Sequence, residues 1–131
     1  MFSEHTSDDH IKKLEHDCKL AQELAKTEEY YDWTMICAFY FAVHCIEAYA
    51  HQHRKEGELL SIDTWDTESL HKKRERFVRD NLKDFFSIYQ RLYNHARHSR
   101  YDPCYFVAIS RTKGYHKRLL DASMKIRSIV K

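Results

Sequence analysis

One stretch of the chain, IYQRLYNHARHSRYDP at positions 88–103, gathers side chains that could bind a phosphate and move a proton. It contains three arginines, two histidines and three tyrosines. An arginine binds phosphate oxygens through paired hydrogen bonds, and histidine is the side chain that titrates nearest neutral pH. Cleavage of RNA needs both groups, because a proton must move while charge develops at phosphorus. The stretch therefore indicates a nucleic-acid or nucleotide site, unless it is only the solvated basic end of a helix.

A helix turns by about 100° per residue, so a face about 120° wide holds Arg91, Asn94, His95, His98 and Tyr101. In a nuclease, Arg91 would hold the scissile phosphate and His98 would act as acid or base, with Asn94 and His95 assisting.

Other residues of the stretch could bind a nucleic acid or nucleotide without taking part in its cleavage. Arg97 and Arg100 lie farther round the same helix and would contact phosphates. Tyr93 or Tyr101 could stack on a base.

A second polar set follows one helical line through the apolar segment 30–54 and consists of Trp33, Cys37, Tyr40, His44, Glu47 and His51. A buried hydrogen bond between a histidine of the stripe and Glu47 explains much of this pattern. The alternative is a polar cleft, to which Tyr40 would also contribute.

Ten histidines make a zinc site worth testing by spacing. His95 and His98 could hold one side of such a site, whereas His51 and His53 point in different directions on a helix. No third and fourth ligand follow at suitable spacing, so the sequence predicts no metal. Glycine-rich phosphate loops and serine nucleophile motifs are also absent, and no cofactor is predicted.

The elements that must position these residues are helices. The 131 residues include two glycines and one proline, too few for the turns of an all-β protein. The composition predicts a single all-α domain over 1–131. No membrane span of about 20 apolar residues and no signal peptide are evident, which predicts a cytoplasmic protein. Four cysteines without a C-x-x-C pair predict buried, reduced thiols.

Apolar periodicity predicts helices over about 8–28, 30–54, 67–79 and 80–101, and a last one after Ser110. A loop is expected over 55–66, and Asp102-Pro103 should end the fourth helix and cap a short helical turn. The predicted inward-facing residues of the later helices are Leu70, Phe77, Val78, Leu82, Phe85, Ile88, Tyr89, Leu92, Ala96, Tyr115, Leu119, Ala122, Ile126 and Ile129.

Charge is divided unevenly along the chain. Residues 1–69 carry 6 Lys and Arg against 15 Asp and Glu, a balance of −9, whereas residues 70–131 carry 16 against 5, a balance of +11. The split suggests a basic face for an anionic partner. Packing of the acidic half beside the basic half, within one chain or across a dimer, would explain it equally well.

Three segments in this order resemble the HEPN superfamily (higher eukaryotes and prokaryotes nucleotide-binding domains). They are DWTMICAFYFAVHCIEAY (32–49), SLHKKRERFV (69–78) and YQRLYNHARHSRY (89–101). The matching positions are Trp33, Phe39, Tyr40 and His44 in the first, His71 and Arg74 in the second, and Arg100 and Tyr101 in the third.

The resemblance implies a four- or five-helix up-and-down bundle over about 8–130 that often forms a homodimer. Many members are metal-independent ribonucleases of toxin–antitoxin, CRISPR and phage-defence systems, and others bind nucleotides, RNA or a protein without catalysis. The nuclease motif is an arginine and a histidine separated by four to six residues, a spacing that Arg91 and His98 satisfy. Leu92 and Ser99 depart from the pattern, where a polar residue and a histidine are usual. Arg111 and His116 match the same spacing.

Three functions remain open. The first is a dimeric module, paired through the segment 30–54, that binds RNA or a nucleotide without turnover; His71 and Arg74 would join its binding residues. The second is an endoribonuclease using Arg91 and His98, with an antitoxin or a nucleotidyltransferase as protein partner. The third is a protein-interaction bundle that contacts no nucleic acid.

Overall fold

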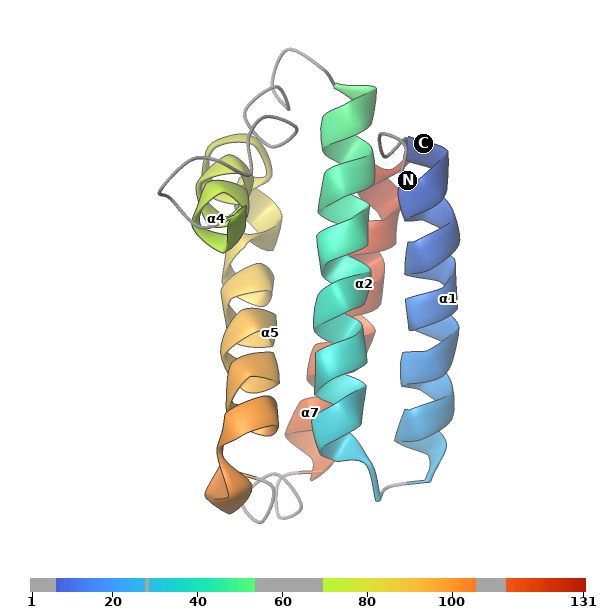
Figure 1. Ribbon diagram of the computed structural model, residues 1–131, viewed down its shortest axis with the longest axis vertical. Coiled ribbons are helices and arrows are strands. Elements are labelled where there is room, and N and C mark those ends of the chain that lie inside the picture. The colour runs from blue at the N-terminus through green and yellow to red at the C-terminus, as the bar shows by residue number, and fades with distance from the viewer. Residues whose placement is uncertain (1–6, 28, 54–69, 106–112) are drawn as a thin grey trace, which may run out of the picture.

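The computed structural model describes residues 7–27, 29–53, 70–105 and 113–131, and all regular structure in these ranges is helical (Figure 1). The prediction of an all-α helical bundle is confirmed. Its elements are α1 (Ser7–Lys26), α2 (Tyr31–Gln52), α4 (Leu70–Asn81), α5 (Lys83–Tyr101), α7 (Lys113–Met124) and the 3-10 helix η1 (Lys125–Ile129). The predicted loop over 55–66 and the start at Ser110 fall outside the described ranges.

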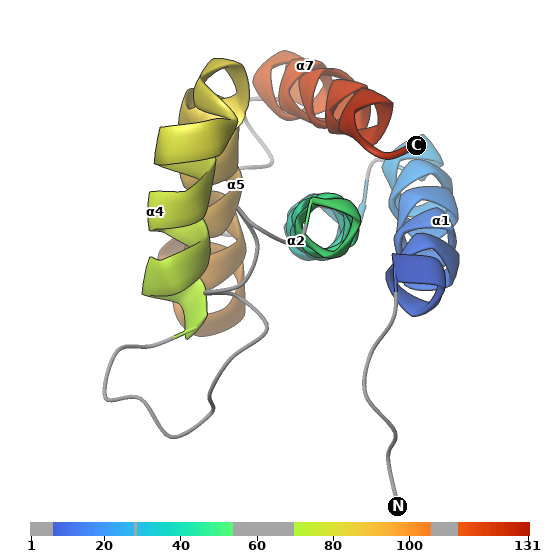
Figure 2. The ribbon, with the colours of Figure 1, turned by 90° about the horizontal axis from the view of Figure 1, so that it is seen from above.

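Helix α2 forms the centre of the bundle. A helix that is apolar around most of its circumference needs cover on most sides. Viewed along its axis, α2 is surrounded by α1, α7 and α5, and no described helix covers its remaining side (Figure 2). Met35, Phe41 and Ile46 are at most 1% exposed, whereas Trp33 is 55% and Tyr40 38% exposed. Among the described residues, α2 therefore has one uncovered edge, and two of its aromatic side chains are exposed.

By length and composition α2 is also the one described helix that could span a membrane. Its most apolar 18-residue window has a mean hydropathy of 1.2, so the expectation that no segment approaches this limit needs correction. However, 72% of that window is buried inside the bundle. This burial is consistent with the core helix of a soluble protein.

Helices α1 and α2 lie side by side over most of their length and run in opposite directions (Figure 1). Leu14 and Ala21 on the inner face of α1 are fully buried. Because the connection between the helices is short, the first turns of α1 lie beside the last turns of α2.

Helices α4 and α5 are separated by a sharp change of direction at Leu82, where the sequence predicted a boundary near residues 79 and 80. Leu82 leaves the helical region, with φ −133° and ψ 52°, and its side chain remains buried. Its backbone N–H donates to the Val78 carbonyl over 2.8 Å, and the Phe85 N–H donates to the Leu82 carbonyl over 2.9 Å. The chain therefore bends without losing these hydrogen bonds, and α4 crosses the direction of α5 (Figure 2).

The end of α5 agrees with the sequence-based prediction. Asp102 adopts an extended conformation before Pro103, as the steric demand of the proline ring requires. The Asp102 carboxylate accepts a hydrogen bond from the Cys104 backbone N–H over 3.0 Å, and residues 103–105 form a helical turn. Asp102 therefore caps the turn that carries Tyr105 toward α5.

Three side chains predicted to be inside are exposed. Leu70, the first residue of α4, is 46% exposed, because a helix end has neighbours on one side only. Tyr115 is 37% exposed, since the first turn of α7 lies at the surface with its hydroxyl directed to α5. Cys104, in the turn after α5, is exposed, whereas Cys45 is buried. Phe77, Val78, Tyr89, Leu92, Ala96, Leu119 and Ile126 are buried as predicted.

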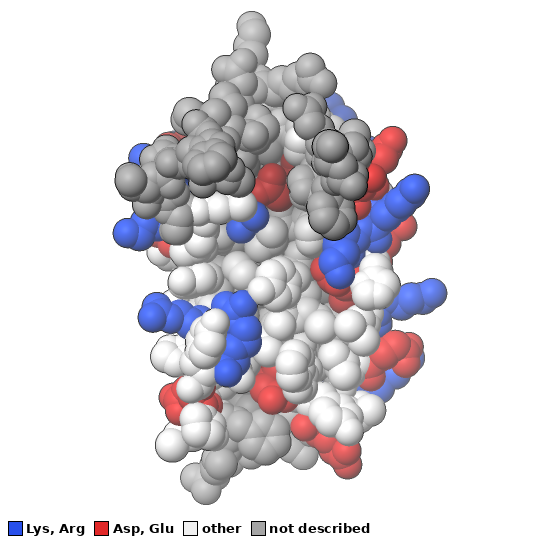
Figure 3. Space-filling view, viewed as in Figure 1, with Lys and Arg blue, Asp and Glu red and all other residues white. Residues whose placement is uncertain are grey.

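Charged side chains are not mixed evenly over the face seen in Figure 3. Lys and Arg predominate over α5, whereas both signs occur over α1, and a mostly uncharged strip runs between them (Figure 3). The basic character of the second half of the sequence therefore reaches the surface at α5.

Candidate functional site

The predicted nuclease residues lie on the side of α5 that approaches α7. His95 donates or accepts at Nδ1 with the Tyr105 hydroxyl, and its Nε2 lies 3.4 Å from the Tyr115 hydroxyl. The His116 ring meets the His95 ring edge-on at 5.2 Å, and its Nε2 lies 3.4 Å from the Tyr105 hydroxyl. We call His95, Tyr105, Tyr115 and His116 the His–Tyr cluster. It joins α5 to α7 through the turn at 103–105.

The environment of His95 keeps its imidazole neutral. Burial, with smaller contributions from the neighbouring His116, His98 and Arg91, lowers its pKa to about 4. A neutral imidazole engaged with two tyrosine hydroxyls is held in one orientation and carries no charge at neutral pH. His95 therefore positions the neighbouring side chains and does not itself attract a phosphate.

Arg91 and Arg118 line one surface hollow beside the His–Tyr cluster. The hollow has a volume of about 240 Å³ and is also lined by Ile88, Tyr115, Leu119 and Ala122. Gly114 leaves room for the Arg118 guanidinium, because a Cβ at that position would lie 3.2 Å from Nη1. Arginine side chains from two helices beside a small, mainly apolar hollow could bind a phosphate joined to a sugar or base.

Arg91, Asn94 and His98 are exposed along the same side of α5. The His98 ring stacks on the Tyr105 ring at 5.7 Å, which directs it along the His–Tyr cluster. His98 lies seven positions after Arg91 in the helix, which places the two residues about 10 Å apart along the axis. Within one chain the two side chains thus stand at opposite ends of the face, with His95 between them.

Predicted binding residues on the other side of α5 contact α2. The Arg100 guanidinium donates to the Tyr40 hydroxyl over 2.8 Å and lies 5.5 Å from the centre of the Tyr101 ring. Tyr101 is 75% exposed and Arg97 is exposed. This edge presents cations and aromatic rings beside the uncovered edge of α2.

Two further predicted binding residues, His71 and Arg74, are engaged inside the bundle. The Arg74 Nε donates to the Glu47 carboxylate over 2.7 Å, and both side chains are largely buried. His71 stacks on Tyr93 at 3.4 Å, and its Nδ1 lies 3.1 Å from the Tyr89 hydroxyl. Burial lowers the pKa of His71. These two residues hold α4 against α2 and α5.

The polar stripe on α2 is organised differently from the predicted histidine–glutamate hydrogen bond. Glu47 accepts from Arg74, because a charged guanidinium is a stronger donor than a neutral imidazole. His44 instead places its Nδ1 2.9 Å from the Nδ1 of His10 on α1. Burial first, and the neighbouring His10 second, lower the pKa of His44 to about 4.

Four polar side chains, three of them histidines, lie close together where the first turns of α1 pack beside the last turns of α2. The rings of His10 and His51 lie 5.3 Å apart, and those of His10 and His44 5.1 Å apart. One ligand atom each from His10, Glu47 and His51 lies within 4.8 Å of the others. We call His10, His44, Glu47 and His51 the His–Glu cluster. It lies at the opposite end of the bundle from the turn at 103–105 (Figure 1).

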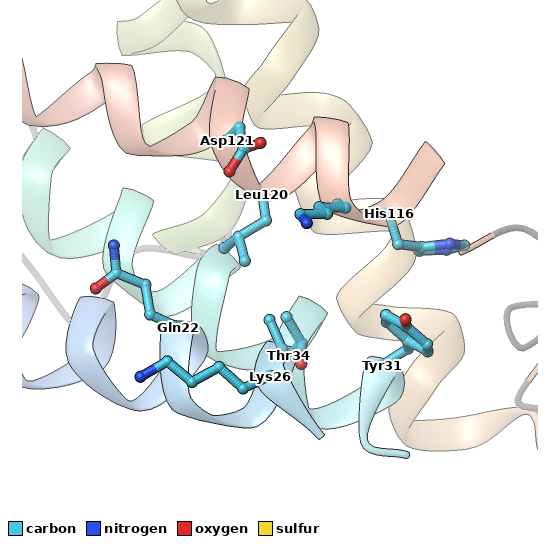
Figure 4. A pocket seen from close by; sticks show the side chains of 9 residues that line it. Gln22, Lys26, Tyr31, Thr34, His116, Leu120 and Asp121 are labelled. Atoms are coloured by element: carbon cyan, nitrogen blue, oxygen red, sulfur yellow. The ribbon is translucent and has the colours of Figure 1, made fainter. Parts of the chain in front are cut away.

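A pocket of about 220 Å³ opens between α1, α2 and α7, and contains none of the predicted site residues. Figure 4 shows Gln22 and Lys26 of α1, Thr34 of α2 and Asp121 of α7 around it. The Thr34 hydroxyl donates to the Tyr30 carbonyl over 2.8 Å and is thus already used within α2. The pocket presents flexible charged side chains at its rim rather than a convergent set of ligands.

The sequence did not reveal Arg118, Tyr105, Tyr115 or His10 as site residues. Tyr115 and Arg118 lie four and seven residues after Arg111, in a segment interpreted only as a core helix. Their role depends on how α7 meets α5, which periodicity does not specify. Comparisons of the chain with protein-family models, with curated proteins and with solved structures give no match.

Proposed function

We propose that this chain is a HEPN-like bundle that forms a homodimer and binds RNA or a nucleotide without turnover. The observation that supports it best is the hollow that Arg91 and Arg118 both line, together with Tyr115. Two arginines from different helices can hold one phosphate from two directions, and the phenol offers a hydroxyl or a ring to the attached sugar or base.

The His–Tyr cluster supports this proposal because it fixes the relation of α5 to α7. Tyr105 and Tyr115 both reach His95, so the helices that carry Arg91 and Arg118 are tied together next to the hollow. A site held in its binding geometry loses less entropy when the ligand arrives.

The uncovered edge of α2 supports the homodimer. Trp33 is 55% and Tyr40 38% exposed on α2, and no described helix covers one side of that helix. Large aromatic side chains are typical anchors of protein interfaces. A second copy would cover this edge and bring two α5 helices, with Arg97 and Arg100, toward each other.

The second candidate function is a metal-independent endoribonuclease. It is favoured by the exposure of Arg91 and His98 along one side of α5. The binding module is preferred because the two side chains stand two helical turns apart in one chain and His95 is neutral and tied to tyrosines. The same uncovered edge of α2 could instead receive an antitoxin or a nucleotidyltransferase.

Binding of a fluorescent single-stranded RNA over a series of salt concentrations tests the proposal. We expect affinity to fall as salt rises, and the slope of log K against log salt to drop by about 0.7 for each phosphate contact removed. Arg91→Ala and Arg118→Ala should each lower the slope. Arg79→Ala is the matched control, since Arg79 is exposed on α4 and pairs with Asp80.

Two results would decide against it. Affinity that does not change with salt, or that falls equally in Arg79→Ala, would reject the hollow as a phosphate site. Cleavage of the RNA in the presence of a chelator, lost in both Arg91→Ala and His98→Ala, would establish the nuclease instead.

A further inference from the structure

The His–Glu cluster brings together a set of side chains that the proposed RNA-binding hollow does not use. His10 and Glu47 are 9% and 7% exposed, and His51 is half-buried. Their ligand atoms all lie within 4.8 Å of one another. Buried imidazoles and a carboxylate converge in this way at metal centres, where two histidines and one glutamate leave a fourth position for water.

We propose that His10, Glu47 and His51 form a binding site for one transition-metal dication of the zinc class. Ligands around tetrahedral zinc lie about 3.4 Å from one another, given metal–ligand distances of about 2.1 Å. The observed separations therefore need to shrink by roughly an ångström or more, which side-chain rotation in a half-buried site can supply. Imidazole nitrogen and carboxylate oxygen together suit zinc and its neighbours better than magnesium or calcium.

The secondary structure places these ligands favourably. Glu47 and His51 are four residues apart on α2, so their side chains lie on one face one turn apart. His10 comes from the first turns of α1, which lie beside the end of α2. Two ligands on one rigid helix and a third on its neighbour would make the metal a link between α1 and α2.

The surrounding hydrogen bonds also suit a metal centre. His10 and His44 share a hydrogen bond between their Nδ1 atoms. When His10 donates in this bond, its Nε2 carries the lone pair that a metal needs. Glu47 accepts from Arg74 through Oε1, which leaves Oε2 as a ligand. Metal-binding side chains are commonly oriented by such outer partners.

Arg74 limits the affinity of the His–Glu cluster for a metal dication. The positive charge of Arg74 offsets the negative charge of the Glu47 carboxylate. The Arg74–Glu47 pair therefore gives the metal site no net negative charge with which to attract a dication. The fourth position would then be filled by a hydroxide or another anion in preference to neutral water. The arrangement favours a dication that binds imidazole strongly, as zinc does, over one that depends on carboxylate charge.

Titration of the metal-free chain with Co²⁺ and Zn²⁺ tests the proposal. We expect one equivalent of Co²⁺ per chain to give the strong visible absorption of a four- or five-coordinate ion, and Zn²⁺ to displace it. Zinc at about 100 times its Kd should raise the Tm by roughly 5–10 °C, because it binds only the folded chain.

Two histidines near the end of α2 make a matched pair of variants. His51→Ala removes a ligand and should weaken binding by more than the roughly 10- to 100-fold expected for an outer partner. His53→Ala should bind as the wild type does, since His53 stacks on Tyr49 at 4.0 Å and is not one of the three converging residues. His10→Gln, on the other helix, should repeat the loss seen for His51→Ala.

Several outcomes would overturn the proposal. They are the absence of a saturable cobalt spectrum in the wild type, equal binding by the wild type and His51→Ala, or equal loss in His51→Ala and His53→Ala. Far-UV circular dichroism verifies that each variant is folded. Because the wild-type titration needs no variant, it decides the question even if a substitution disrupts the fold.

Discussion

The molecule contains two histidine clusters at opposite ends of the bundle, and they differ in the partner given to the imidazoles. In the His–Tyr cluster, His95 and His116 are bonded to tyrosine hydroxyls. In the His–Glu cluster, imidazoles of α1 and α2 surround a carboxylate that also binds Arg74. Both clusters join two helices, but only the second contains an ionised acid among its converging groups.

The difference determines what each cluster can attract. A phenol is neutral at physiological pH and donates or accepts a single hydrogen bond, so it stabilises a neutral imidazole. A carboxylate stabilises cations, whether guanidinium, imidazolium or metal. The His–Tyr cluster is thus suited to orient the arginines beside it, which can bind an anion. The His–Glu cluster is suited to hold a cation.

The strongest test of this contrast removes the carboxylate. Glu47→Ala leaves the Arg74 charge largely buried without its partner, and should lower the free energy of unfolding by about 3 kcal/mol. Urea unfolding at neutral pH measures the change. Glu23→Ala is the control: its pair with Lys26 is exposed, so the change should stay within about 0.5 kcal/mol.

The double variant Glu47→Met with Arg74→Met separates charge from packing. Replacing both partners removes the unpaired charge, so most of the lost stability should return. A loss below about 1 kcal/mol in Glu47→Ala would mean that the pair is effectively solvated, and would contradict a low-dielectric His–Glu cluster.

Acid should weaken the His–Tyr cluster in a defined pH window. The folded pKa of His95 is lowered to about 4 from an ordinary value of 6.5, so the unfolded chain binds its proton first. Its contribution is therefore complete above pH 6.5 and is lost as the pH falls toward 4. After allowance for solvent screening, the free energy of unfolding should fall by roughly 1–2 kcal/mol over this pH range.

The variant His95→Gln isolates the contribution of His95 to the pH dependence of stability. The other groups around His95, which the variant keeps, are His98, Arg91, Tyr105, Tyr115 and His116. In His95→Gln, the loss of stability between pH 7 and pH 4 should be smaller than in the wild type by about that amount. Parallel stability curves for the two chains would show that His95 titrates normally and that the tyrosines do not keep it neutral.

Helix positions followed from the sequence because apolar residues recur at helical spacing. The predicted segment 8–28 corresponds to Ser7–Lys26, and 30–54 to Tyr31–Gln52. The bend at Leu82 was placed two to three residues early, since no glycine or proline marks it.

The two clusters were harder to predict, because each depends on contacts between helices. Spacing within one helix did not connect His10 with Glu47. Yet His10 lies 16 residues before the end of α1 (26 − 10), and Glu47 lies 16 after the start of α2 (47 − 31). In an antiparallel pair with a short connection such positions face each other, so the hairpin alone could have revealed the pair. The placement of Arg118 beside the same hollow as Arg91 has no comparable signal, since apolar periodicity does not specify how α7 packs against α5.

The smallest expected effect tests whether tyrosine hydroxyls give the His–Tyr cluster its character. Tyr105→Phe removes the hydroxyl that meets His95 and His116 but keeps the ring that stacks on His98. This substitution should lower the free energy of unfolding by about 1 kcal/mol, the usual net value of a lost hydrogen bond. Urea unfolding at pH 7 measures the change. Tyr101→Phe, at a tyrosine that is 75% exposed, should change stability by less than about 0.5 kcal/mol. Equal effects in the two variants would mean that ring packing alone holds α5 to α7. The contrast with the His–Glu cluster would then rest on the carboxylate and not on the phenols.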